Sequence, residues 1–219
     1  MATASPDINR TFVAPTPSSR SALIVVDLQG AFCESTGSLS RLGMDTSPLR
    51  EAIGGCQSLV GAAREVGALV VFTILGYRDD YADAGRSFWE MQQPVVAAGG
   101  LVRGTADTQL VAGIETAPDD VLIDKQHSDA FRGTNLDAVL RARRVDDVVV
   151  CGVTTSVCVA ATARSASELG YRTWIAADAS AETSTNLHLA ALETFGRAYG
   201  YVSDTDSICV AWRGEEAEP

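Results

Sequence analysis

The sequence predicts one α/β domain of three layers, in which helices cover both faces of a six-stranded, mostly parallel sheet of Rossmann type. Two observations indicate this fold. Short β-branched apolar runs alternate along the chain with stretches of helical spacing, and such alternation implies right-handed crossovers between parallel strands. In addition, 219 residues are enough for one well-packed core and few for two.

The expected elements follow one another through residues 21–213, which we take as the domain. The first strand is a continuous apolar run that ends at Asp27, as is typical of a strand buried on both faces. The helices show apolar residues three and four positions apart. Strands are expected at 22–26, 68–75, 121–124, 148–151, 171–177 and 207–212, and helices at 48–66, 105–113, 134–144, 156–170 and 187–199.

Three further segments lack a regular pattern. Residues 1–20 are rich in Ser, Thr and Pro and are expected to form a flexible arm, and 214–219 form an acidic tail. Residues 76–104 are rich in Gly, Asp and aromatic side chains. A connection this long is more often a binding loop or lid than a passive link.

Composition narrows the classes of partner. A formal net charge of −11 argues against binding to nucleic acid or to an anionic membrane, because both require a basic surface. The five cysteines form no CxxC pair, and two histidines are too few for a His-rich zinc site. With no signal-peptide pattern or apolar span in view, we expect a cytoplasmic protein that acts on a small molecule.

Cys158 is the candidate nucleophile. It lies in a strand, turn and helix sequence, because Gly152 breaks the apolar run 148–151 and an Ala-rich helical pattern follows. The first N–H groups of a helix favour a thiolate and can also hold the oxygen of a carbonyl under attack. The alternative is that Cys158 packs as a small apolar residue, as buried cysteines commonly do.

Two other reactive side chains end expected strands. Asp27 closes the first strand and Lys125, the single lysine of the sequence, closes the third. Ligands bind beyond the carboxyl ends of parallel strands, so both could share one rim with Cys158. Asp27 could then carry the proton between thiol and leaving amine, while Lys125 orients it and favours the thiolate. Alternatively, Asp27 caps a turn and Lys125 is a solvated charge or half of an ion pair.

Three motifs resemble those of the isochorismatase-like cysteine hydrolases over roughly residues 22–208. They are VVDLQGAF at 25–32, DK at 124–125 with SDAFRGTNL at 128–136, and GVTTSVCV at 152–159. The resemblance implies a catalytic triad of Asp27, Lys125 and Cys158. It also implies a cis peptide between Val153 and Thr154, an oxyanion hole formed by the N–H groups of Thr154 and Cys158, and a homodimer or homotetramer.

Departures from the family pattern narrow the chemistry. The region 77–81 lacks the histidines that form the metal site of nicotinamidases, so we expect no metal and no other cofactor. Isochorismatases typically lack the nucleophilic cysteine, so Cys158 favours amide chemistry over vinyl ether hydrolysis. The segment 76–85 is most similar to the carbamoyl-, ureido- and lactam-cleaving members, such as ureidoacrylate amidohydrolase, biuret hydrolase and streptothricin hydrolase. Ser156 replaces the Asn of many relatives.

The expected substrate is therefore a small compound with an amide, lactam, ureido or carbamoyl C–N bond. Acidic residues at 79, 80 and 83 would suit a cationic lactam. A non-catalytic ligand-binding or partner module on the same fold, and a vinyl ether hydrolase, are the alternatives. Five side chains are candidates for the pocket wall: Gln29, Phe32, Tyr77, Trp89 and Phe131.

Overall fold

The computed structural model describes residue 15 and residues 19–214, so most of the expected arm and tail lie outside the described part. The described chain has a six-stranded parallel sheet in the order β3-β2-β1-β4-β5-β6. The expected fold class is confirmed. The strands are β1 Ser21–Val26, β2 Leu69–Leu75, β3 Val121–Lys125, β4 Asp147–Val153, β5 Arg172–Ala181 and β6 Tyr201–Ser203.

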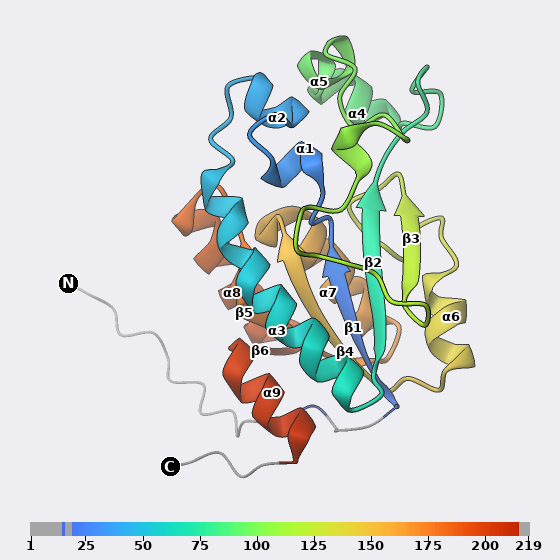
Figure 1. The fold of residues 1–219 in the computed structure, drawn as a ribbon, viewed down its shortest axis with the longest axis vertical. Coiled ribbons are helices and arrows are strands. Elements are labelled where there is room, and N and C mark those ends of the chain that lie inside the picture. Colours follow the sequence, from blue (N-terminus) through green and yellow to red (C-terminus); the bar gives the residue numbers. More distant parts are fainter. Residues whose placement is uncertain (1–14, 16–18, 215–219) are drawn as a thin grey trace, which may run out of the picture.

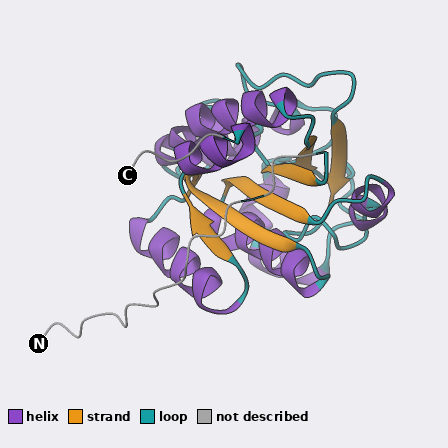
Figure 2. Cartoon of the chain, turned by 90° about the horizontal axis from the view of Figure 1, so that it is seen from below, coloured by secondary structure: helices purple, strands orange, loops and turns teal. Residues whose placement is uncertain are grey.

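Helices lie on both faces of this sheet, which Figure 2 shows between two helical layers. The larger helices are α3 Ala52–Glu65, α6 Leu136–Ala142, α7 Ala160–Glu168, α8 Thr185–Ala198 and α9 Thr205–Arg213. The shorter elements are α1 Gly30–Cys33, α2 Ser38–Arg41, η1 Ser47–Glu51, α4 Arg86–Met91, α5 Gln93–Ala97, η2 Ala106–Thr108 and η3 Thr155–Val159.

The two cores follow from the alternation of side chains along β1. Leu23 and Val25 point to the face covered by α3 and α9, whereas Ile24 and Val26 point to the face covered by α6, α7 and α8. Every residue of β1 is buried, which explains its continuous apolar run. The central strand is therefore fixed from both sides, and the residue that follows it has a well-defined position.

The sixth strand was predicted wrongly. Residues 207–212 form part of α9, and the strand β6 lies earlier, at Tyr201–Ser203. Ile208 and Trp212 are an even number of positions apart, so they could share one face of a strand. They also lie four positions apart, which places them on one buried face of a helix. Asp204 caps the helix by accepting a hydrogen bond from the Ser207 N–H, and Gly214 ends it in the left-handed conformation.

Two other boundaries differ from the sequence prediction. The expected helix 105–113 is reduced to the short turn η2, and β5 extends beyond the predicted end at 177 to Ala181. The irregular segment 76–104 contains α4 and α5, which lie with α1 and α2 beyond the carboxyl ends of the strands (Figure 1). Within the described residues, no helix is long and apolar enough to cross a membrane.

Candidate active site

Asp27 and Lys125 form a buried ion pair at the carboxyl edge of the sheet. Lys125 Nζ lies 2.7 Å from Asp27 Oδ2, and both side chains are fully buried. The intervening strand β2 supplies Thr73, whose hydroxyl donates a hydrogen bond of 2.7 Å to Asp27 Oδ1. Lys125 Nζ also donates to the His127 carbonyl at 3.1 Å. Each carboxylate oxygen of Asp27 therefore has a fixed donor, which holds its orientation.

Cys158 completes this cluster from the opposite side of β1. It lies in η3, a single π-helical turn between β4 and α7, and its sulfur is close enough to Asp27 and Lys125 for both to act on its pKa. The side chain is 4% exposed. The structure thus brings together the three residues that the sequence placed at separate strand ends, and π-helical turns of this kind occur frequently at functional sites.

The surroundings of Cys158 favour its thiol over its thiolate. Burial raises the pKa of Cys158, the positive charge of Lys125 lowers it and the negative charge of Asp27 raises it again, to about 12. The pKa of Lys125 is raised by Asp27 and Cys158, against the effect of its own burial. The sequence reasoning expected a thiolate, but it did not include complete burial beside a carboxylate. Asp27 is instead placed to accept the thiol proton.

The backbone that presents Cys158 has the expected unusual geometry. The Val153–Thr154 peptide is cis, as the family resemblance implied. Gly152 has a φ of 111°, and a Cβ atom there would lie 2.2 Å from the Val26 carbonyl oxygen. Only glycine permits this approach of β4 to β1. Thr154 and Cys158 both line the same pocket.

A pocket of about 600 Å³ opens above the cluster. Its wall comes from α1, α2, η1, α4, α5, the loop after β3, the η3 turn and the residues that follow β5. The expected binding segment 76–104 contributes many of these lining residues, most of them apolar. The pocket is therefore a largely apolar chamber with the reactive sulfur in its wall.

The candidate wall residues divide into two groups. Phe32 and Tyr77 line the pocket, and burial, with a smaller effect of Cys158 and Asp27 nearby, raises the pKa of the Tyr77 phenol. Gln29, Trp89 and Phe131 do not line it.

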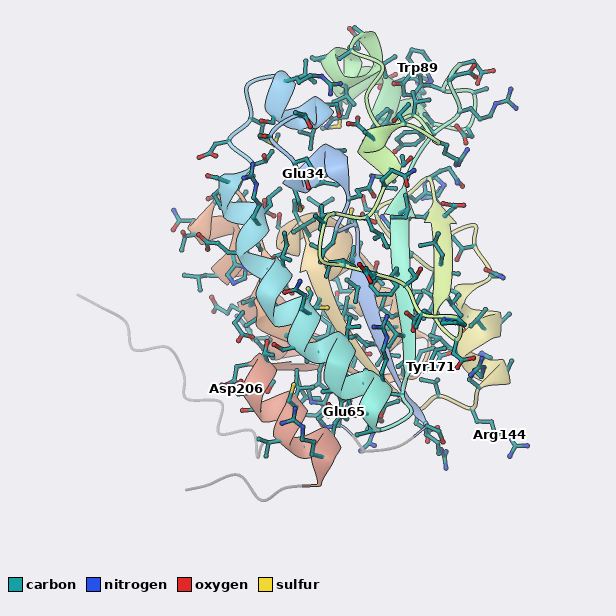
Figure 3. All side chains as sticks on the ribbon, in the orientation of Figure 1. Glu34, Glu65, Trp89, Arg144, Tyr171 and Asp206 are labelled. Carbon is teal, nitrogen blue, oxygen red and sulfur yellow. The ribbon has the colours of Figure 1, made fainter. Side chains whose placement is uncertain are left out.

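Each of these three side chains has another contact. Gln29 is buried and bridges the chain by donating to the Leu75 and Asp107 carbonyls. Trp89, at the upper edge of Figure 3, packs edge-on against Tyr81. Phe131 stacks on Tyr171.

The acidic loop does not face the pocket. Asp80 pairs with Arg78 at 3.0 Å, and Asp83 pairs with Arg103 at 2.7 Å. Asp79 is exposed, and none of the three acidic residues lines the pocket. These carboxylates therefore give no support to a cationic substrate, because two of the three already pair with an arginine of their own segment.

Sequence reasoning missed several residues of the site. Nothing in the sequence indicated a site role for Thr73, because a residue within a buried strand is expected to serve in packing. Glu182 could have been noticed only if β5 had been extended to its true end. Arg132 lies within the motif 128–136 but was not considered as a lining residue. Among the described residues, no group of three His, Cys, Asp or Glu side chains is arranged to hold a metal ion.

Comparison with known proteins assigns the family. The model of the isochorismatase domain matches residues 21–207. The chain belongs to the isochorismatase-like cysteine hydrolase family. It is thus an isochorismatase-family hydrolase, and the match spans all three residues of the buried cluster.

Solved structures of this family share the fold. A cysteine hydrolase from Pseudomonas syringae pv. phaseolicola is 28% identical, with a TM-score of 0.83, covering 93% of this chain and 98% of that one. N-carbamoylsarcosine amidase from Thermoplasma acidophilum is 26% identical (TM-score 0.69, 85% and 97% covered). Pyrazinamidase/nicotinamidase from Streptococcus mutans is 28% identical (TM-score 0.74, 84% and 99% covered). These isochorismatase-family neighbours do not single out the carbamoyl, ureido and lactam subgroup.

Proposed function

We propose that this protein is a metal-independent cysteine amidohydrolase that cleaves a C–N bond of a small molecule through a thioester. The observation that supports this proposal is the buried cluster of the Asp27–Lys125 ion pair with Cys158, which lines a pocket. A thiol, a carboxylate beside it and a lysine that holds the carboxylate are the groups that acyl transfer to sulfur needs. Two of the similar structures are named as amidases, which is consistent with this chemistry.

The first half-reaction forms the thioester. Asp27 accepts the thiol proton while the sulfur of Cys158 adds to the carbonyl carbon, and the resulting oxyanion is held by the N–H groups of Thr154 and Cys158. When the tetrahedral intermediate collapses, the C–N bond breaks and Asp27 returns the proton to the departing amine. Lys125 keeps its positive charge throughout and holds the carboxylate between sulfur and amine.

The second half-reaction releases the acid. Asp27 takes a proton from water, whose oxygen adds to the thioester carbonyl, and the C–S bond breaks as the proton passes to sulfur. The enzyme returns to the thiol form, which the surroundings of Cys158 favour. Candidate substrates are amides, ureido and carbamoyl compounds and lactams of a size that a pocket of about 600 Å³ can hold.

The test is a screen for released ammonia or ring opening with these compound classes, using the natural chain and its Cys158→Ala variant. We expect turnover by the natural chain and a loss of at least about a thousandfold in the variant, because no other group in the cluster can form the thioester. Thermal melting of the variant should stay close to that of the natural chain, because alanine removes one sulfur from the pocket wall.

The intermediate provides a second measurement. Acid quenching during turnover, followed by intact-mass analysis, should show the acyl group of the substrate on Cys158. Turnover that persists in Cys158→Ala would refute the covalent route. A protein that binds these compounds without hydrolysing any of them would instead be a ligand-binding module.

A further inference from the structure

The charged groups in the pocket wall indicate what kind of substrate the pocket recognises. Besides Cys158 and Tyr77, four lining side chains can bear charge: Arg86, His127, Arg132 and Glu182. A charged group on a ligand is best recognised by a side chain whose hydrogen-bonding capacity is not already used. The partners of each of the four therefore decide which charge a ligand can carry.

Glu182 has no remaining capacity for a cation. Its Oε2 accepts hydrogen bonds from the Ser156 N–H at 3.1 Å and the Ser156 hydroxyl at 2.6 Å. Its Oε1 accepts from the Thr183 N–H at 2.9 Å and the Thr183 hydroxyl at 3.3 Å. A carboxylate has about four lone-pair sites, so all the acceptor positions of Glu182 are filled from within the protein.

Two of the three basic side chains are also accounted for. The guanidinium of Arg86 pairs with Glu90 at 2.6 Å, one turn further along α4. Burial lowers the pKa of His127, and the positive charge of Arg132 lowers it further, which favours the neutral imidazole. Neither side chain offers an uncompensated positive charge to a ligand.

Arg132 differs from these groups. Among residues 19–214, no carboxylate lies within ion-pair distance of its guanidinium. Asp129, three residues earlier, is engaged elsewhere: one oxygen accepts from the Phe131 N–H at 2.8 Å and the other from the Ser165 hydroxyl at 2.7 Å. Arg132 is exposed and lines the pocket, and its long side chain carries a planar fork of donors that matches a carboxylate.

We propose that Arg132 binds a carboxylate of the substrate, so that the substrate is a small amide or ureido compound with an acidic group and not a cation. Cleavage of the C–N bond at the other end of such a molecule rests on the proposed function, whereas the binding of its acidic group does not. Apolar side chains such as Phe32, Leu75 and Leu101 line the space around a short hydrocarbon linker. Because the net charge of −11 repels anions, the local arginine is what makes their binding favourable.

Binding can be measured apart from catalysis in the Cys158→Ala variant, which cannot turn a ligand over. The probes are malonamate, succinamate and glutaramate, each compared with its neutral diamide, by ligand-observed NMR titration. We expect at least one anion to bind about threefold to tenfold more tightly than its diamide, the range for a charge-assisted contact at an exposed side chain. Adding Arg132→Gln should bring this ratio to about one, and Arg132→Lys should keep part of it.

Arg144→Gln is the matched control, because Arg144 lies at the opposite end of the molecule and its loss changes the net charge equally (Figure 3). It should leave the ratio unchanged. The proposal would be overturned if no anion bound measurably, or if the ratio of anion to diamide affinity were one or less at all three chain lengths. It would also be overturned if the ratio survived Arg132→Gln or were lost in Arg86→Gln. Ammonia release from the unsubstituted chain is scored separately. A preference for anions without hydrolysis would refute the proposed hydrolase and leave the carboxylate subsite standing. Equal hydrolysis of anions and diamides would support the hydrolase and refute the subsite.

Discussion

At the scale of single residues, Asp27 has two opposing effects on Cys158. Its negative charge raises the pKa of the thiol, and its carboxylate is the base that removes the thiol proton during reaction. Asp27→Asn should therefore lower the pKa of Cys158, because the remaining charge beside the sulfur is the Lys125 ammonium. We expect Cys158 to react with iodoacetamide about tenfold faster at pH 7.5 in this variant, while amide hydrolysis is lost.

The measurement is intact mass against time, with peptide mapping to separate Cys158 from the other buried cysteines. Thr73→Val is the control, because it removes the two hydrogen bonds between the Thr73 hydroxyl and Asp27 and leaves the charge in place. A slower alkylation of Cys158 in Asp27→Asn would contradict the assignment, since it would mean that the carboxylate stabilises the thiolate. An unchanged rate would mean that Asp27 does not control the sulfur at all.

At the scale of elements, the η3 turn is held by the segment that follows β5. Glu182 accepts two hydrogen bonds from Ser156, and His188 Nδ1 lies 2.9 Å from the Thr155 hydroxyl. We expect Glu182→Ala to lower kcat about tenfold to hundredfold with a smaller change in KM, because the turn that carries Cys158 would lose its alignment. Ser156→Ala should have a smaller effect, since the backbone N–H bond to Glu182 remains, and Glu182→Gln should restore part of the activity.

Steady-state kinetics together with thermal melting test this positioning role of Glu182. A structural role alone would lower the melting temperature in proportion to the loss of activity, whereas a positioning role lowers kcat in folded protein at temperatures well below the melt. Equal kinetics for Glu182→Ala and the unsubstituted chain would contradict it. The contact also gives the Ser156 hydroxyl its acceptor, at 2.6 Å from Glu182 Oε2.

At the scale of the whole molecule, the fold class and most strands were predictable, whereas only Phe32 and Tyr77 of the five predicted wall residues line the pocket. Periodicity gave five of the six strands and the carboxyl-edge positions of Asp27 and Lys125, because a continuous apolar run has one interpretation in a parallel sheet. The strand β6 was missed because it has too few residues to show an alternating pattern of apolar side chains. Contacts such as those of Gln29 and Glu182 join segments tens of residues apart, and a pattern read along the chain does not contain them.

The burial of several acidic groups also predicts how the stability of the whole domain depends on pH. Burial raises the pKa of Cys33 and of Cys158 to about 12 from an ordinary value of 9.0. Between these values the unfolded chain loses thiol protons that the folded chain keeps, so the free energy of unfolding falls as pH rises above 9, by at most about 1.4 kcal/mol per thiol for each pH unit. Urea titrations under reducing conditions at pH 8, 9.5 and 10.5 should show this decline, and Cys158→Ala should make it shallower by removing one of the thiols whose pKa is raised in the folded chain. A decline with the same slope in that variant would mean that Cys158 is already a thiolate in the folded protein.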